Sequence, residues 1–433
     1  MSTASASTDD DLAVYTGRLK RDLLELATIG QDPKSRGIYR IGFSEQDMLA
    51  RTWLRERIEA AGGQASLDGA GNVIGHFAGQ EDLAPVLVGS HIDTAPAGGM
   101  FDGTLGVLSG LESMRALKDA GQTLRRPVEL VAFADEEGRF GGMFGAQALC
   151  GHITADWVHN AHDVDGLRLV DAMKAHGLDP MAALEAARQP KDVHAFLELH
   201  IEQGPVLEQE RAAIGLVEGI AGIFKWVVHL VGKAAHAGTS PMHMRSDAFM
   251  GLVDFAHEIS RIIDEDGTEH SRLTVGKVEL VPGNPHTIPG EVIFSLVGRD
   301  MDPKVMNELA NSCRKVLSSI ARRHNLNFDF EQLSWLEPQA CDDGLLGIFE
   351  AQADALGLSH RRMPSGAGHD TQFMAGLTRA AMIFVPSVGG ISHAPDEWTH
   401  WSDVENGANV LLRTLAVVAN EPDHASDKAS GNA

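Results

Sequence analysis

The chain has 433 residues, which is too long for one ordinary hydrophobic core and fits two domains. Its 60 acidic and 36 basic residues give a formal net charge of −24. Because the charges are spread along the chain without a lysine or arginine block, nucleic acid and anionic membranes are poor partners. Three cysteines without CxxC spacing argue against a disulfide scaffold or a thiolate zinc site.

The start of the chain carries no sign of export. Its first ten residues, MSTASASTDD, lack the basic and apolar regions of a signal peptide. No apolar run approaches the roughly 20 residues that a membrane helix needs. We therefore expect a cytoplasmic protein with frayed polar ends at residues 1–10 and 420–433.

The first part of the chain alternates amphipathic helices with short apolar strands, which predicts an α/β layer with a mainly parallel, buried central sheet flanked by helices. The predicted helices are 12–29, 44–61 and 106–120, and the predicted strands are 72–77, 85–88 and 128–134.

The pattern changes near Gly215 to the order β-α-β-β-α-β, which is the split unit of a ferredoxin-like α+β domain. After about Trp335 the α/β style returns. We therefore expect a discontinuous catalytic domain (1–214 and 333–433) with an inserted domain (215–332). The predicted elements are strands 224–231, 273–280, 291–299, 327–332 and 380–385, and helices 240–263, 303–324 and 344–356.

One glycine-rich stretch, GSHIDTAPAGGMFDG at residues 89–103, follows an apolar strand directly. Ligands of open α/β sheets gather at the carboxyl ends of strands, and glycine lets the backbone bring His91 and Asp102 to one point. The alternative is a turn in which Asp93 and Asp102 cap backbone amides.

A second polar block, VELVAFADEEGRFGG, ends a buried strand in three consecutive acids, Asp135, Glu136 and Glu137. Adjacent carboxylates repel one another unless a cation or a proton lies between them. A solvated acidic turn is the alternative for such a run. The position at the end of a buried strand, like that of His91, favours a site.

Two more histidines lie at strand ends. AFLELHIEQGPVLE places His200 and Glu202 at alternate positions of a strand, and MIFVPSVGGISHAPDEWTH leads from a strand through a glycine turn to His393. A lone histidine there is more often structural, but four such clusters together indicate a metal site. Its candidate ligands, suited to zinc, manganese, cobalt or nickel, are His91, Asp102, Glu137, His200 and His393.

Six blocks resemble the signature blocks of the M20 metallopeptidase superfamily. They are GSHIDTAPAGGMFDG, FADEEGRF, ELHIEQGPVLE, AAHAGTSPMHMRSDA, PSGAGHDTQFMA and VPSVGGISHAPDEWT, in the expected order across about residues 12–415. They are most similar to the branch of N-carbamoyl-L-amino acid hydrolases, β-ureidopropionases and allantoate amidohydrolases. In one departure from the family, Gly138 is followed at once by Arg139, where the block usually has one more residue.

The resemblance implies two divalent metal ions per subunit, with Asp102 bridging them. It implies that Asp93 orients a ligand, that Glu136 is the general base and that His236 is a lid histidine that stabilises the oxyanion, often in a neighbouring subunit. The implied ligands are His91, Asp102 and His200 for one ion and Asp102, Glu137 and His393 for the other. The residues implied to hold the substrate carboxylate are Gln203, Asn284 and Arg299.

Two of these residues have structural alternatives: His236 could cap the following helix, and Arg299 could form an ion pair with Asp300 or Asp302. His369 and Asp370 match a family block but are interpreted as supporting residues and not as ligands.

The expected reaction is hydrolysis of an N-carbamoyl-L-amino acid to amino acid, carbon dioxide and ammonia. The expected assembly is a homodimer whose inserted domain serves as lid and dimer interface. Allantoate or another ureido acid, a dipeptide, or an N-acyl amino acid is the alternative substrate for the same metals. A third hypothesis is a metal-stabilised binding protein without catalysis, which the presence of Glu136 beside a full ligand set disfavours.

Overall fold

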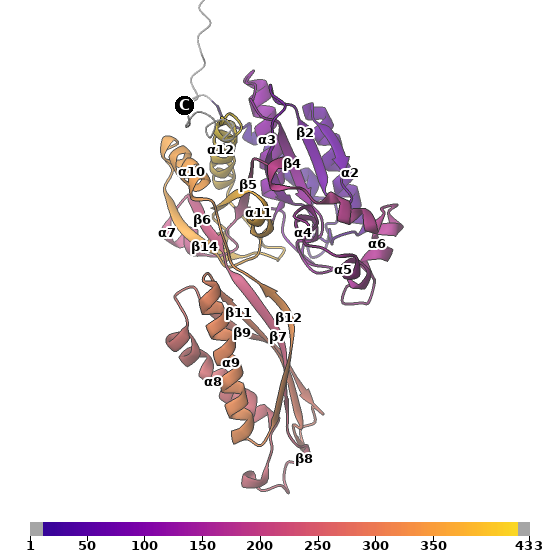
Figure 1. Ribbon diagram of the computed structural model, residues 1–433, viewed down its shortest axis with the longest axis vertical. Coiled ribbons are helices and arrows are strands. Elements are labelled where there is room, and N and C mark those ends of the chain that lie inside the picture. The colour runs from indigo at the N-terminus through magenta and orange to yellow at the C-terminus, as the bar shows by residue number, and fades with distance from the viewer. Residues whose placement is uncertain (1–11, 423–433) are drawn as a thin grey trace, which may run out of the picture. The chain divides into compact units, whose positions relative to one another are not determined.

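The computed structural model describes residues 12–422, so the predicted polar end at residues 1–10 lies outside the described residues. The chain forms two compact units (Figure 1). Unit 1 comprises Met1–Glu218, Cys341–Met363 and His369–Ala433, and unit 2 comprises Gly219–Ala340 and Pro364–Gly368. The boundary predicted at 332/333 differs from this division because it falls inside a strand of unit 2.

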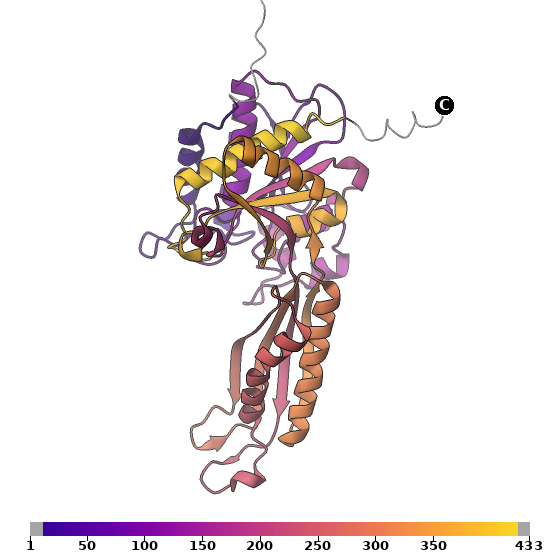
Figure 2. The same ribbon diagram turned by 90° about the vertical axis from the view of Figure 1, so that its left-hand side faces the viewer.

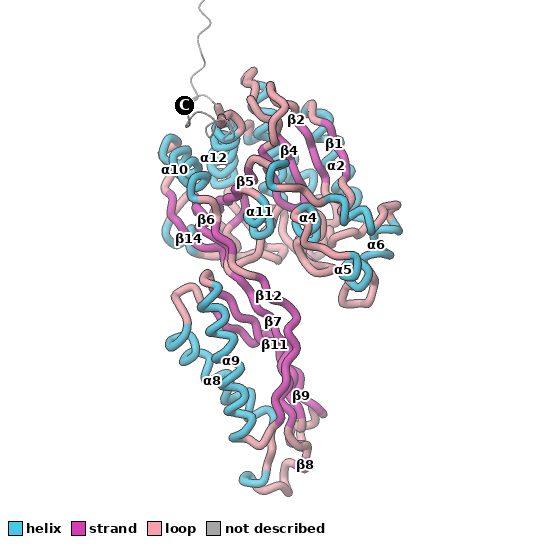
Figure 3. Tube along the Cα trace, viewed as in Figure 1, coloured by secondary structure: helices cyan, strands magenta, loops and turns pink. Residues whose placement is uncertain are grey.

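A nine-stranded sheet is the framework of unit 1 (Figure 3). Its order is β1-β2-β4-β3-β5-β15-β6-β13, with β14 paired to β6. The four central strands β4, β3, β5 and β15 run parallel, and the flanking pairs are antiparallel. The strands are β1 (Gln64–Leu67), β2 (Val73–Phe77), β3 (Val86–His91), β4 (Val128–Phe133), β5 (Ala195–Ile201), β6 (Ile214–Ile220), β13 (Gln339–Ala340), β14 (His360–Ser365) and β15 (Arg379–Val385).

Helices cover both faces of this sheet. The central strands are apolar and almost entirely buried, as strands covered on both sides must be. One layer contains α1, α3, α10 and α12, which contact one another in series, whereas α4 and α11 pack together against the other face (Figure 2). The helices of unit 1 are α1 (Thr16–Ala27), α2 (Glu45–Ala61), α3 (Thr104–Asp119), α4 (Phe144–Leu149), α5 (Ala155–Asn160), α6 (Leu169–Ala175), α7 (Val206–Glu210), α10 (Asp343–Ala355), α11 (Thr371–Leu377) and α12 (Trp401–Val418).

Unit 2 has a four-stranded antiparallel sheet in the order β12-β7-β11-β9, with α8 and α9 packed on one face. Alternate residues of β7 and β11 face an apolar core that includes Phe224, Phe255 and Phe294. The chain order and strand order are those of a ferredoxin-like unit. The elements are β7 (Gly222–Val231), β8 (Ala235–His236), α8 (Ala248–Asp266), β9 (Arg272–Val281), β10 (Thr287–Ile288), β11 (Glu291–Asp300), α9 (Pro303–Arg323) and β12 (Asn327–Leu336).

Two predicted boundaries in unit 2 are wrong. The helix expected from residue 240 begins at Ala248, because Asp247 caps it and the guanidinium of Arg245 holds the preceding loop through the carbonyls of Ala237 and Ser240. The strand expected at 327–332 continues to Leu336 beyond a register shift after Gln332, which interrupts the alternating pattern.

All three cysteines are free thiols. Within residues 12–422, none of the helices combines the length and the apolar composition that crossing a membrane requires.

Candidate metal centre

The carboxyl ends of the four parallel strands bring the predicted ligands to one edge of the sheet. This follows from the fold, because parallel strands end at the same edge and the loops after them converge there. His91 ends β3, Asp102 lies in the loop between β3 and α3, Glu137 follows β4, His200 lies in β5, and His393 follows β15.

Asp102 lies between two groups of potential ligands. Its Oδ1 is 3.6 Å from Nε2 of His91 and 3.1 Å from Nε2 of His200. Its Oδ2 is 3.2 Å from Nε2 of His393, which is 3.4 Å from Oε2 of Glu137. Each oxygen of the Asp102 carboxylate thus forms, with two neighbouring side chains, a group of three potential ligands that could hold a metal ion.

The spacing and the chemistry of these donors fit a divalent ion. Nitrogen and oxygen ligands about 2.1 Å from a tetrahedral ion lie about 3.4 Å from each other, close to the distances around Asp102. The donors are imidazoles and carboxylates without thiolate, the set that suits zinc and its neighbours in the first transition row.

Charge is concentrated in this buried place. Burial and the charge of Asp102 raise the pKa of Glu137 to about 7. Burial raises the pKa of Asp102 too, but hydrogen bonds from His200, His393 and His91 outweigh it and hold that pKa well below its ordinary value. The hydrogen bond with Asp102 raises the pKa of His393 to about 9. Protons and metal ions therefore compete for the same atoms.

Glu136 belongs to neither group of ligands, although its Oε2 lies 3.6 Å from Nε2 of His91. Burial raises the pKa of this carboxyl group well above its usual value. A buried carboxylate with a raised pKa, beside the ligands but not among them, has the properties of a general base.

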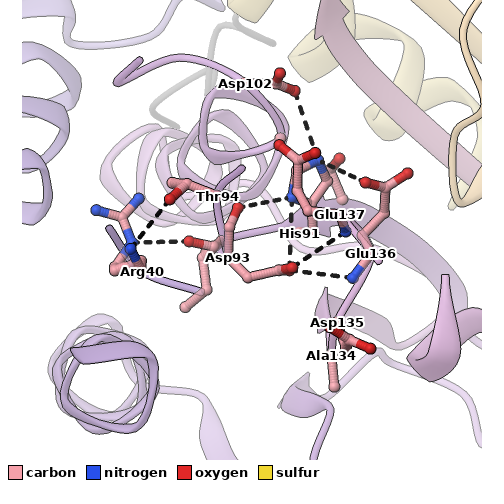
Figure 4. A network of polar contacts seen from close by, with 12 residues as sticks. Arg40, His91, Asp93, Thr94, Asp102, Ala134, Asp135, Glu136 and Glu137 are labelled. Atoms are coloured by element: carbon pink, nitrogen blue, oxygen red, sulfur yellow. Dashed lines mark hydrogen bonds and ion pairs between the residues drawn. The ribbon is translucent and has the colours of Figure 1, made fainter. Parts of the chain in front are cut away.

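Asp93 is buried beneath this site (Figure 4). The backbone oxygen of Asp93 lies 3.0 Å from Nδ1 of His91, and its carboxylate oxygen lies 3.7 Å from the same atom. The carboxylate accepts hydrogen bonds from the backbone amides of Glu136 at 3.3 Å and Glu137 at 3.1 Å. Asp93 thus contacts the His91 ring mainly through its backbone and fixes the acidic loop through its side chain.

Several residues that sequence reasoning missed position Asp102. Oε1 of the buried Glu397 accepts the amide of Asp102 at 3.2 Å, and the Ser392 hydroxyl donates to the Asp102 carboxylate at 3.0 Å. The side-chain amide of Gln203, a predicted substrate residue, also donates to that carboxylate, at 2.8 Å. The acid in the PDEW segment, after His393, was the signal for Glu397.

Arg40 ties together the two ends of the loop that carries Asp102. Its buried guanidinium donates to the carbonyl of Ile92 at 2.8 Å and to the hydroxyl of Thr104 at 3.2 Å. Burial lowers its pKa to about 10. No sequence motif marked this residue, because its partners are mostly backbone atoms.

A third group of potential ligands, Glu198, His200 and His369, lies behind the centre. The Glu198 carboxylate accepts hydrogen bonds from the hydroxyls of Ser90 at 2.7 Å and Thr371 at 2.6 Å. The ring of His369 contacts that of His200, with 4.5 Å between centroids. The His369 ring therefore packs against the ring of His200, and Glu198 is held by the two hydroxyl groups.

Glu202 is not part of the strand that carries His200, although it was expected at an alternate position of that strand. The strand β5 ends at Ile201, and the Glu202 carboxylate accepts hydrogen bonds from the amides of Val206 and Leu207. It therefore caps the first turn of α7.

The remaining predicted residues lie in unit 2. Nδ1 of His236 accepts hydrogen bonds from the amides of Gly238 and Thr239, so it closes a turn and does not cap a helix. The Asn284 side chain accepts the amide of His286. Nη1 of Arg299 donates to the carbonyl of Gly366 at 2.6 Å, and among residues 12–422 no carboxylate lies within ion-pair distance of it.

Replacing Gly103 by alanine is expected to displace His91 and to weaken metal binding. Gly103 has a φ of +62°, and an added Cβ would lie 2.3 Å from the His91 ring. Gly121→Ala is the matched control, since Gly121 has a φ of +67° and no neighbour within 4 Å. Both variants should lose about 1 kcal/mol through backbone strain, and only Gly103→Ala should also lose bound metal in elemental analysis. Equal metal contents would contradict this role.

The gain in melting temperature on adding metal is expected to increase between pH 6 and pH 9. The raised pKa values of Glu137, about 7, and His393, about 9, mean that the metal-free folded protein binds protons more tightly than the unfolded chain does. That stabilisation is present at low pH and is lost as the pH rises through these values. A metal ion replaces the protons, so thermal melting with chelator and with added ion should diverge as the pH rises. A gain independent of pH would contradict the assignment.

The match to a family model follows the geometry just described. The model of Peptidase family M20/M25/M40 matches residues 87–417, and the chain belongs to this family. It is an amidohydrolase of that family, as are relatives named N-carbamoyl-L-amino-acid amidohydrolase and allantoate amidohydrolase.

Two similar proteins indicate the branch. The N-carbamoyl-L-amino-acid amidohydrolase of Paenarthrobacter aurescens is 36% identical over 403 residues, which cover 92% of this chain and 97% of that protein. The allantoate amidohydrolase of Escherichia coli (strain K12) is 35% identical over 397 residues, covering 91% and 96%.

A solved structure is similar over nearly all of the chain. It is the amidase of the hydantoinase/carbamoylase family from Burkholderia multivorans, with a TM-score of 0.87 and 35% identity. The similarity covers 95% of this chain and 100% of that one.

Proposed function

We propose that the protein is a dinuclear metal-dependent amidohydrolase that cleaves the carbamoyl C–N bond of N-carbamoyl-L-amino acids. The observation that carries this proposal is the position of Asp102, whose two carboxylate oxygens face different sets of ligands. The Glu136 carboxylate lies beside His91 of one set and is part of neither. A bridging carboxylate and a free general base are the two parts that a two-metal hydrolytic centre needs. Relatives named N-carbamoyl-L-amino-acid amidohydrolase support the choice of bond.

Two divalent ions, zinc, manganese, cobalt or nickel, would polarise the ureido carbonyl and lower the pKa of a water molecule. Glu136 accepts a proton from this water as its oxygen bonds to the ureido carbon, and then donates the proton to the departing nitrogen as the C–N bond breaks. Ammonia leaves first, and the remaining carbamate loses carbon dioxide to give the free amino acid. One water is consumed.

The substrate carboxylate would be held by Gln203, Asn284 and Arg299. Arginine suits this task because its planar guanidinium binds a carboxylate through two hydrogen bonds. The absence of a described carboxylate partner for Arg299 supports its availability. His236, which is exposed, would stabilise the developing oxyanion.

The test is a substrate panel after metal loading. Protein freed of metal with chelator and reloaded separately with each of the four ions is given N-carbamoyl amino acids, allantoate, dipeptides and N-acyl amino acids. We expect metal-dependent release of ammonia from N-carbamoyl amino acids at the highest kcat/KM. Absence of turnover on every ureido compound would reject the proposal.

Other outcomes of the panel select the alternatives. Allantoate as the best substrate is favoured by the similarity to allantoate amidohydrolases. Cleavage of dipeptides or N-acyl amino acids would agree with a two-metal centre but would assign it a different scissile bond. A fully metal-loaded protein without any turnover would point to a binding protein.

We also propose a homodimer formed through unit 2. The strand β9 has a partner on one side only, β11, and the helix α8 beside it exposes Phe249, Met250 and Val253. An open sheet edge next to an apolar helix face suits pairing with a second copy across a two-fold axis. Light scattering should give twice the 46.4 kDa mass of the chain, and a monomer at micromolar concentration would contradict this arrangement.

The three free cysteines support a reducing compartment such as the cytoplasm.

A further inference from the structure

A pocket opens beside the candidate metal centre at the carboxyl ends of β3 and β4. Its volume is about 380 Å³, within the range of small-molecule sites. Four loop segments line it, around Ile41, Ala95, Gly138 and Val164. Glu137, one of the candidate ligands, forms part of the wall. The pocket therefore adjoins the place where the reacting bond would lie, and it lies entirely in unit 1.

The walls of this pocket are mainly apolar. Ile41, Ala95 and Pro96 contribute hydrocarbon surface, and the Val164 side chain at the rim is fully exposed, at 101% of its reference area. Covering an exposed valine side chain with an apolar ligand group removes hydrocarbon surface from water, which is favourable for binding. The wall chemistry thus favours a hydrocarbon ligand group.

Arg139, the one basic residue that lines the pocket, is already paired. Nε of Arg139 donates to Asp163 at 3.1 Å, and Nη1 donates to the carbonyl of Gly42 at 3.0 Å. Asp163 also accepts the amides of Asp165 and Leu167. The exposed carboxylate of Asp165 remains at the rim, where it disfavours an acidic ligand group. Arg139 therefore acts as part of the wall and leaves the pocket without a free cation for a second carboxylate.

The geometry of an N-carbamoyl amino acid fits this position. Three bonds separate the ureido carbon from the side-chain Cβ, a reach of about 4 Å. Because Glu137 belongs both to the candidate ligands and to the pocket wall, a ureido group bound at those ligands would lie beside the pocket. The shortened block Gly138–Arg139 forms the adjoining wall.

We infer that this pocket holds the substrate side chain and selects N-carbamoyl amino acids with apolar side chains of the size of leucine, methionine or phenylalanine. The inference rests on the proposed function, because it assigns the group attached to the reacting ureido nitrogen.

The test compares kcat/KM for N-carbamoyl-L-leucine and N-carbamoylglycine. The native protein should prefer the leucine compound by more than about 10-fold, as a filled apolar pocket does. Ala95→Phe fills the pocket and should lower this ratio by about 10-fold or more, with less effect on the glycine compound. Ala60→Phe is the matched control, since Ala60 is exposed near the far end of α2, about 24 Å from Ser44, and should leave the ratio unchanged.

A second variant avoids any risk to folding. Val164→Asp changes a fully exposed side chain, so the protein should keep its melting temperature while the charge at the rim lowers the leucine-to-glycine ratio by about 3-fold or more. An unchanged ratio in folded, active Ala95→Phe and Val164→Asp proteins would overturn the pocket assignment and leave the proposed function intact. If the native protein cleaves only N-acyl amino acids or dipeptides, the proposed function fails. The leucine-to-glycine ratio of kcat/KM in that series of compounds then tests whether the pocket holds the side chain. Cleavage of no series would overturn both.

Discussion

The Glu136→Gln protein is expected to keep its metal ions and to lose between about 10²-fold and 10⁴-fold in kcat. Glutamine preserves the size of the side chain but cannot accept the proton of the attacking water. The metals should stay because Glu136 belongs to neither group of ligands. Elemental analysis and ammonia release on the same sample measure the two properties separately.

Glu137→Gln provides the comparison, because it makes the same chemical change on the neighbouring residue, which is a candidate ligand. This variant should lose metal as well as activity. If Glu136→Gln lost metal to the same extent, or kept its turnover, the assignment of Glu136 as the base would be wrong. Similar metal loss in both would instead make Glu136 a ligand.

The Asp102→Asn protein should show the largest loss of metal affinity, by more than about 100-fold for both ions, together with loss of detectable turnover. Asparagine has one oxygen and no charge, so it cannot serve both sets of ligands. Ser392 and Gln203 donate hydrogen bonds to Oδ2 of Asp102. In the variant they would face either the uncharged amide oxygen or the amide NH2 group, which is itself a donor.

Asp264→Asn is the control for this change, since Asp264 is an exposed residue of α8 in unit 2 and should keep both metals and turnover. A calorimetric titration of the metal-free protein with metal ion gives the number of bound ions and their affinities. A single ion lost, with the other bound as in the native protein, would show that Asp102 serves one site only.

The sequence predicted the candidate ligands because each of them lies in, or shortly after, an apolar strand of the parallel sheet. Such strands are recognisable by composition, and their ends meet at one edge. The strand pattern alone therefore predicts that His91 and His393 lie at the same edge of the sheet. The resemblance to the family implies which side chains bind the same ion. The roles of the individual residues stay predictions.

The supporting residues could not be predicted in the same way. The bond between Glu397 and the amide of Asp102 joins positions 295 residues apart, and local pattern contains no information on such a pair. Arg40 binds mostly backbone carbonyls, which any sequence provides. Strand alternation also failed at Glu202, because it assumes that the strand continues, whereas β5 ends at Ile201.

Element boundaries in unit 2 failed for a related reason. Helical periodicity does not mark where capping begins, so the loop before Asp247 was included in the helix. A bulge shifts the alternation of a strand by one position, so the end of β12 read as a loop. The order of elements, which depends on composition over longer windows, was recovered.

The contacts of Glu397 and His393 with the Asp102 loop have a consequence for the order of events during synthesis. The ribosome makes the candidate ligands that follow the first strands early in synthesis. Glu397, which binds the amide of Asp102, and His393 emerge only with the C-terminal segment. Until then the acidic loop lacks its final ligand and its anchor. The second group of potential ligands is thus complete only late in synthesis, and a chain truncated before residue 390 would lack its His393.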